Sequence, residues 1–192
     1  MLSDKKNALN TAMVTEDIDS LPQLTITERQ LYDLEMLLVG GFSPLTGFMN
    51  EEEYTGVVDS MRLPSGSLFP IPIVCDIGED TPYSVGDTVL LCDPSGNPLA
   101  TLDITSRFTP DKEKEVLSVY GTNDLLHPGV AYIQKETKAV YIGGPVKKVT
   151  LPERDDFKEF RKTPEELREY FKEKGWDTVI GFQTRNPMHR AH

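Results

Sequence analysis

The sequence has no long apolar run, and this absence excludes a large class of proteins. None of its 192 residues belongs to a stretch of eighteen consecutive apolar residues, so no segment has the pattern of a membrane-spanning helix. The first fifteen residues are polar and lack the hydrophobic centre of a secretory signal. They fit either a frayed tail or the remnant of a transit peptide. We therefore expect neither a membrane nor a secretory pathway as the protein's destination.

Cysteine and basic residues are also scarce. Cys75 and Cys92 lie in strand-like runs without Cys-x-x-Cys spacing, which predicts two buried free thiols in a reducing compartment. We expect a cytoplasmic protein, with a plastid as the alternative. Lys and Arg number 20 against 31 Asp and Glu, and the formal net charge is -11. Since a basic stripe is missing, nucleic acid is not an expected partner.

The carboxyl-terminal segment has the sequence signals of a helix, a short strand and a polar loop in succession. Thr163, Pro164 and Glu166 form a capping box with proline at the first helical position, which predicts a helix that ends near Gly175. The apolar, β-branched run 178–182 then predicts a short buried strand of a parallel sheet. Helix, turn, strand and polar loop are typical of an open α/β sheet, whose ligands bind beyond the carboxyl ends of the strands.

The loop 183–192 has the chemistry of an anion site. Arg185 offers a planar fork of donors, and Gln183 adds a neutral amide donor. Pro187 is suited to open a helix, on which His189 and His192 would share a face. A lone His-x-x-His pattern favours an ordinary surface helix, and it is weak evidence for zinc. The combination with Gln-Thr-Arg-Asn-Pro after a strand favours an oxyanion, and we predict no protein-bound metal.

The preceding part predicts helices followed by many short strands. Thr27 and Gln30 form a capping box, and Asn50 caps a second helix whose inward stripe we expect to be Tyr54, Val57, Val58 and Met61. A turn is expected over 94–98. Short strands separated by Gly, Pro and Asp predict a small mixed barrel. The candidate strands are 69–75, 88–91, 99–107, 115–120, 130–133 and 140–142.

Several motifs together resemble the ATP sulfurylase (sulfate adenylyltransferase) family. The loop 183–192 contains every fixed position of that family's Gln-x-Arg-Asn-Pro-x-His-x-x-His pattern. The segments 40–49, 63–66, 127–128 and 141–144 also resemble its amino-terminal domain. The resemblance implies an α+β chain, with a PUA-like mixed β-barrel followed by the start of a Rossmann-like nucleotidyltransferase domain. The corresponding division is a tail over 1–20, a barrel over 21–162 and a catalytic beginning over 163–192.

The resemblance also implies a reaction. Sulfate and MgATP would give adenosine 5′-phosphosulfate and pyrophosphate, with Mg²⁺ entering as part of MgATP. The implied sulfate-binding residues are Gln183 and Arg185, and the implied catalytic residues are Thr184, Arg185 and Asn186. The implied ATP-binding residues are Gln183, Asn186, His189 and His192. His127 is expected to be a loop residue outside the catalytic set.

The family's later anion-binding Gly-Arg-Asp loop does not occur in these 192 residues. We therefore expect the chain to be the front portion of a longer enzyme that is a homo-oligomer at full length, and to be inactive alone. The alternatives are a non-catalytic PUA-like binding module or a relic fragment. A third reading keeps adenylyl transfer but changes the acceptor to a nicotinate- or pantetheine-type nucleotide.

Overall fold

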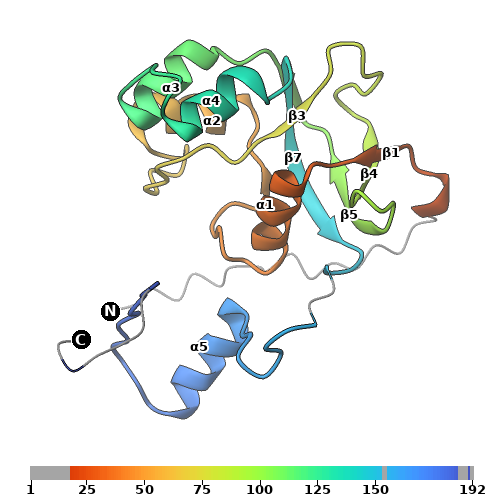
Figure 1. The fold of residues 1–192 in the computed structure, drawn as a ribbon. Helices are drawn as coiled ribbons and strands as arrows, with labels where there is room; N and C mark the ends of the chain where they lie inside the picture. The colour runs from red at the N-terminus through yellow and green to blue at the C-terminus, as the bar shows by residue number, and fades with distance from the viewer. Residues whose placement is uncertain (1–17, 153–154, 186–189, 191–192) are drawn as a thin grey trace.

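The computed structural model describes residues 18–152, 155–185 and 190. Among the described residues, a mixed sheet, the short 3-10 helix η1 and four α-helices precede residue 149, and a fifth α-helix follows (Figure 1). The elements, in chain order, are η1 (Ile18–Ser20), β1 (Gln23–Thr25), α1 (Glu28–Leu38), β2 (Gly47–Phe48), α2 (Glu51–Ser60), β3 (Cys75–Ile77), β4 (Thr88–Cys92), β5 (Pro98–Asp103), β6 (Ser106–Phe108), α3 (Lys112–Tyr120), α4 (Pro128–Lys135), β7 (Val140–Lys148) and α5 (Pro164–Glu173).

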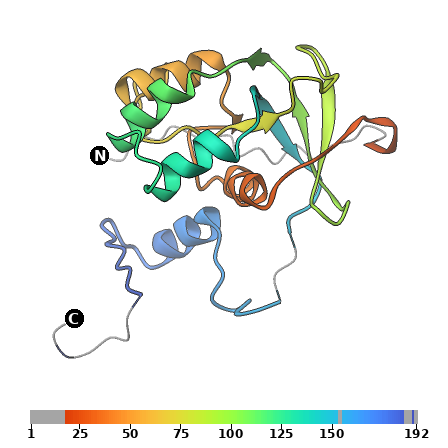
Figure 2. The ribbon, with the colours of Figure 1, turned by 45° about the horizontal axis from the view of Figure 1, so that its top comes forward.

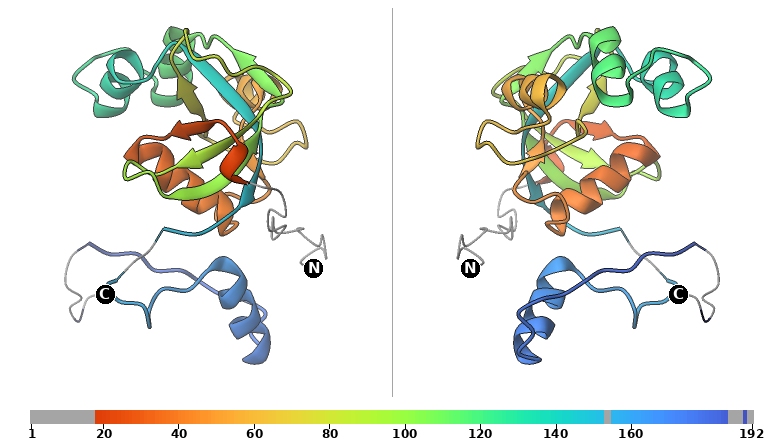
Figure 3. Two further views of the ribbon diagram at one scale, coloured as in Figure 1. Left: turned by 90° about the vertical axis from the view of Figure 1, so that its right-hand side faces the viewer. Right: turned by 90° about the vertical axis from the view of Figure 1, so that its left-hand side faces the viewer.

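Strand β7 organises the sheet. Its first half pairs antiparallel with β3 and β6, its middle with β2, and its last residues with β5. The hairpin partner of β5 is β4, and β1 adds to β4 in parallel. Because several short strands pair with different parts of the long strand β7, the sheet curls around its core as a half-barrel (Figure 3). The architecture is the expected α+β fold.

The core lies inside this curl. Phe48, Met49, Leu102, Tyr141 and Ile142 are among its fully buried side chains, and α1 and α2 contribute their apolar stripes. The predicted capping box at Thr27 is confirmed, with Thr27 Oγ1 accepting from the Gln30 amide. Asn50 caps α2 as predicted, with its Oδ1 accepting from the Glu53 amide, and the Glu53 carboxylate completes a capping box that we did not predict. Met61 is a correction, because it ends α2 in the left-handed region at φ 55 and is exposed rather than inward.

Two predicted strands are helices, and capping explains why. Residues 115–120 lie in α3, where the Asp111 carboxylate accepts from the Lys114 amide and Gly121 stops the helix at φ 69. Residues 130–133 lie in α4, which His127 caps: its Nδ1 accepts from the amides of Gly129 and Val130. These local hydrogen bonds outweigh the strand preference of the valines and isoleucines between them.

The other predicted strands differ mainly at their ends. Only Cys75 of the segment 69–75 is in a strand, because Pro70 and Pro72 have no amide hydrogen for a ladder. The segment 99–107 divides into β5 and β6, and the strand that begins at Val140 continues to Lys148. The turn over 94–98 joins β4 to β5, with the Asp93 carboxylate accepting from the amides of Ser95 and Asn97. Both cysteines are buried free thiols, as expected.

The cap of α2 gives a stability prediction. Asn50→Ala removes the acceptor for the Glu53 amide and is expected to lower the free energy of unfolding by about 1 kcal/mol. Urea unfolding monitored by circular dichroism measures this change. Asn123→Ala, at an exposed position between α3 and α4, is the matched control and should change stability by less than about 0.5 kcal/mol. Equal effects in the two variants would show that the cap contributes nothing.

Candidate functional site

The predicted anion loop follows helix α5, which forms as the sequence predicts. Thr163 Oγ1 accepts from the Glu166 amide at 3.2 Å, and Glu166 Oε2 accepts from the Thr163 amide at 2.7 Å. Gly175 ends the helix at φ 66, and the Trp176 ring then stacks on Phe171 at 6.1 Å. In the views of Figures 1 and 3, α5 lies apart from the half-barrel, and it buries none of its side chains.

The segment 178–182 corrects a prediction. It is neither a strand nor buried: Ile180 is 89% exposed and Phe182 is 65% exposed. A strand needs backbone partners, and within the described part of the chain no other strand lies beside this segment. Its apolar, β-branched composition is therefore left without the sheet that would bury it.

The structure contains part of the predicted site. Gln183, Thr184 and Arg185 lie on the exposed chain that follows Phe182. Asn186, His189 and His192 lie outside the described residues. The structure therefore gives no distance between the amide and guanidinium groups on one side and the histidines on the other. The segment 155–162 before α5 is exposed, and its charges pair locally, with Arg161 Nη2 2.6 Å from Asp156 Oδ1.

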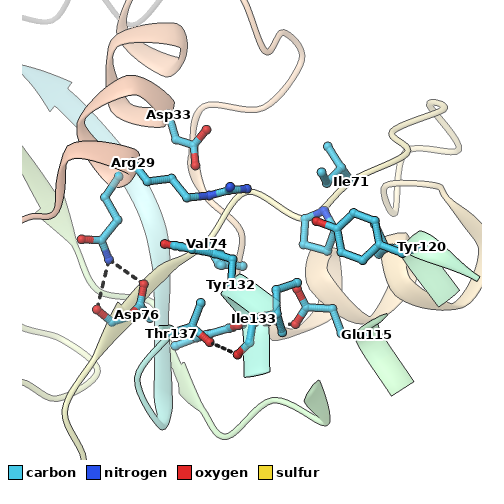
Figure 4. A pocket seen from close by; sticks show the side chains of 14 residues that line it. Arg29, Asp33, Ile71, Val74, Asp76, Glu115, Tyr120, Tyr132, Ile133 and Thr137 are labelled. Carbon is cyan, nitrogen blue, oxygen red and sulfur yellow. Dashed lines mark hydrogen bonds between the residues drawn. The ribbon is translucent and has the colours of Figure 1, made fainter. Parts of the chain in front are cut away.

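A second candidate lies in the barrel domain, which sequence reasoning did not identify. A cavity opens between α1, the segment before β3, the helices α3 and α4, and β7 (Figure 4). Arg29 enters it from α1, with its guanidinium 4.4 Å from the centre of the Tyr132 ring. Asp33 lies on the same helix, and Glu115 on α3 also lines the cavity. The volume of about 20 Å³ is room for roughly one water molecule.

The carboxyl of Glu115 is the most unusual group in this cavity. The residue is 2% exposed, and its Oε2 accepts from the hydroxyls of Tyr54 at 2.8 Å and Tyr141 at 3.4 Å. Burial raises the pKa of Glu115, and the two hydroxyl hydrogen bonds oppose the shift. Burial also raises the pKa of Asp33 to about 6, against the attraction of Arg29. Both carboxyls therefore take up a proton more readily than exposed ones.

Two of the lining residues, Gln30 and Asp76, belong to a hydrogen-bond network. The Gln30 side-chain amide donates to the Asp76 carboxylate at 2.9 Å and to the Asp76 carbonyl at 3.1 Å. The other Asp76 oxygen accepts from the Lys138 amide at 2.8 Å. This network ties α1, β3 and the segment just before β7 together. The sequence signal was weak, because Glu115 lies in a segment that we predicted to be a strand.

The fold and the loop motif together indicate the protein family to which the chain belongs. A family model described as PUA-like domain matches residues 4–151, and a model described as ATP-sulfurylase matches residues 158–192. The chain belongs to the PUA-like domain family. More particularly, it corresponds to the amino-terminal portion of the ATP sulfurylases, as its loop pattern predicted. Among the residues that the structure describes, no helix is long and apolar enough to cross a lipid bilayer.

Individual relatives support this assignment. The sulfate adenylyltransferase of Mycosarcoma maydis is 43% identical over 192 residues, covering 97% of this chain and 33% of the relative. That of Schizosaccharomyces pombe is 45% identical over 92% of this chain and 37% of the relative. A solved structure described as "Hexameric APS kinase from Thiobacillus denitrificans" matches with a TM-score of 0.66 at 32% identity, over 90% of this chain and 30% of that one. The chain thus spans about a third of the length of these relatives.

Proposed function

We propose that this chain provides the PUA-like domain and the nucleotide loop of a sulfate adenylyltransferase. The enzyme would transfer the AMP group of ATP to sulfate, giving adenosine 5′-phosphosulfate and pyrophosphate. In this proposal residues 21–162 form the barrel domain and residues 163–192 begin a Rossmann-like catalytic domain. The observation that carries it is the complete loop pattern from Gln183 to His192, which follows the capped helix α5 and the apolar segment 178–182.

The described residues of the loop suit this chemistry. Gln183 and Arg185 are two residues apart, so on an extended chain their side chains lie on the same side. A guanidinium fork beside an amide donor matches the oxygens of a tetrahedral anion. Thr184 and Asn186 would contact the α-phosphate, and His189 and His192 would hold the phosphates of ATP.

The reaction requires positioning and charge neutralisation. A sulfate oxygen attacks the α-phosphorus, a new phosphorus–oxygen bond forms, and the bond to the β-phosphate oxygen breaks to release pyrophosphate. Negative charge develops on the leaving pyrophosphate, where nearby donors lower the barrier. Guanidinium and amide donors bind oxyanions rather than cations, so Mg²⁺ would arrive already bound to the phosphates of ATP.

The natural polypeptide tests this function directly. Incubated with MgATP and labelled sulfate, it should form labelled adenosine 5′-phosphosulfate and release an equal amount of pyrophosphate. Release of pyrophosphate without sulfate, or no labelled product at saturating ATP, would contradict the proposal. We also infer that the active protein is a homo-oligomer, in line with the hexameric state of the similar solved structure. Its mass in solution measures this.

Anion competition distinguishes sulfate from a bulkier acceptor. Molybdate and perchlorate have nearly the size of sulfate, so each should inhibit adenosine 5′-phosphosulfate formation competitively with sulfate. The physical reason is that the Gln183 and Arg185 donors select a small tetrahedral anion. Steady-state rates at several sulfate concentrations measure the effect. An acceptor site built for a nicotinate- or pantetheine-type nucleotide would be indifferent to both anions.

A further inference from the structure

Helices α3 and α4 have a small core of their own. Val116, Val130 and Ile133 form it, with Tyr120 and Tyr132 packed against it, whereas the large apolar cluster belongs to the half-barrel with α1 and α2. The two helices lie side by side along one face of the molecule in Figures 1 and 2, and they contact each other closely. We call residues 111–137 the α3–α4 unit.

Polar and aromatic contacts attach this unit to the rest of the domain. The Tyr54 hydroxyl on α2 donates to Glu115 on α3 at 2.8 Å. The Arg29 guanidinium on α1 lies over the Tyr132 ring on α4. Directly after the unit, the Lys138 amide donates to the Asp76 carboxylate on β3. Contacts of this kind are replaced by water more readily than a continuous apolar core, because water can satisfy each group that they release.

The polar cavity lies on this boundary. Glu115 belongs to the α3–α4 unit, but both hydroxyls that donate to it, those of Tyr54 and Tyr141, belong to the barrel side. If the unit swings away, the carboxyl of Glu115 moves from a nearly dry position into water. The free energy of closing therefore includes the cost of burying whatever charge this group carries.

We propose that the α3–α4 unit opens and closes on the barrel as one body, and that protonation of Glu115 in the cavity between them favours the closed form. The groups around that carboxyl come from every element that packs there. They are Arg29 and Asp33 on α1, Tyr54 on α2, Asp76 on β3, Lys112 and Tyr120 on α3, Tyr132 on α4 and Tyr141 on β7.

The direction of the pH dependence follows from the raised pKa values of the two carboxyls, Glu115 and Asp33. Burial raises the pKa of Glu115 in the closed form, and that of Asp33 rises to about 6 for the same reason. A raised pKa means that the closed form binds the proton more tightly than the open form does. The closed form is therefore most stable below the ordinary carboxyl pKa, and this stabilisation is lost as the pH rises through the raised values. Opening should increase from acid to neutral pH.

Amide hydrogen exchange of the full polypeptide tests the proposed pH-dependent opening of the α3–α4 unit. Exchange is followed by mass spectrometry at several values between about pH 4.5 and pH 7 and corrected for its intrinsic pH dependence. We expect the amides of α3 and α4 to exchange through a local opening that leaves β4 and β5 folded, and therefore with a lower free energy of opening than the amides of β4 and β5. The equilibrium constant for opening of α3 and α4 should increase with pH, by up to about tenfold for each unit by which the carboxyl pKa differs between the closed and open forms.

Matched substitutions identify the group responsible. Glu115→Gln is expected to keep the amides of the α3–α4 unit protected from exchange. It should also remove most of the pH dependence of opening, leaving only the part that Asp33 contributes. Glu113→Gln, at an exposed position of the same helix, should leave the pH dependence unchanged. Tyr54→Phe removes a donor that stabilises the ionised carboxylate, so it should increase the opening at neutral pH more than at acid pH.

Two outcomes would overturn the proposal. One is exchange of α3 and α4 by the same opening as β4 and β5, because the unit would then have no separate motion. The other is a pH-dependent opening that Glu115→Gln does not reduce. If the glutamine variant fails to fold, Tyr54→Phe decides alone: an equal increase in opening at acid and neutral pH would contradict a role for the ionised carboxylate.

Discussion

Arg185→Ala in the natural polypeptide is expected to lower sulfate-dependent turnover at least about a hundredfold while leaving the fold intact. The reason is that the substitution removes a charged donor from the proposed sulfate site, and one such donor contributes on the order of 3 kcal/mol to transition-state stabilisation. Arg185 is exposed on the chain after Phe182, so the barrel core does not depend on it. Initial rates of pyrophosphate release with and without sulfate give the turnover, and circular dichroism checks the fold.

The control for this variant is Arg168→Ala, which removes an exposed arginine from helix α5 without touching the loop. It should retain turnover within about twofold, since an exposed helical position has little effect on stability. Near-normal turnover in Arg185→Ala would disprove the assignment of the sulfate site. A loss of equal size in both variants would show that the effect comes from the segment as a whole rather than from the guanidinium of Arg185.

Gly143→Ala is expected to destabilise the barrel by about 3 kcal/mol or more, because the new methyl group has no space. A Cβ at this position would overlap the backbone carbonyl of Met49, where the chain enters α2. Backbone atoms of a buried residue cannot move aside as the end of a flexible side chain can. The Gly143 carbonyl also accepts from the Thr105 amide at 2.9 Å, so a shift of β7 would disturb a second contact. Urea unfolding of both proteins measures the difference.

Gly121→Ala separates this overlap from the general cost of replacing glycine. Gly121 ends α3 at φ 69 and has open space around its Cα, so alanine there should cost only about 1 to 2 kcal/mol of backbone strain. We therefore expect Gly143→Ala to be clearly more destabilising than Gly121→Ala. The reverse order would mean that β7 and the segment before α2 yield easily, and that their close approach does not fix the curl of the sheet.

Local signals in the sequence predicted the helix starts well. Thr27, Asn50 and Thr163 each cap a helix through a capping box, because the partner three residues later completes a hydrogen-bonded pair that needs no tertiary contact. Asp111 and His127 also cap helices but lack such a box, and the segments after them were wrongly predicted to be strands. Valine and isoleucine pack equally well in a strand or on the buried side of a short helix, so composition alone does not separate them.

The sites were less accessible to sequence reasoning. The loop residues Gln183 and Arg185 are proposed as site residues from their sequence pattern, and a pattern gives no distances. The segment 178–182 was predicted to be a buried strand, yet a strand forms only beside a partner. The cavity around Glu115 could not be predicted, since its residues come from α1, the segment before β3, α3, α4 and β7 and meet only when the chain folds. Long-range packing, rather than local preference, determines such a site.

The most direct test of the central claim is a crystal structure of the natural polypeptide with adenosine 5′-phosphosulfate bound. The account predicts sulfate oxygens within about 3 Å of the Arg185 guanidinium and the Gln183 amide, with the α-phosphate near Thr184 and Asn186. A product molecule bound elsewhere, with Gln183 and Arg185 still facing solvent, would contradict it.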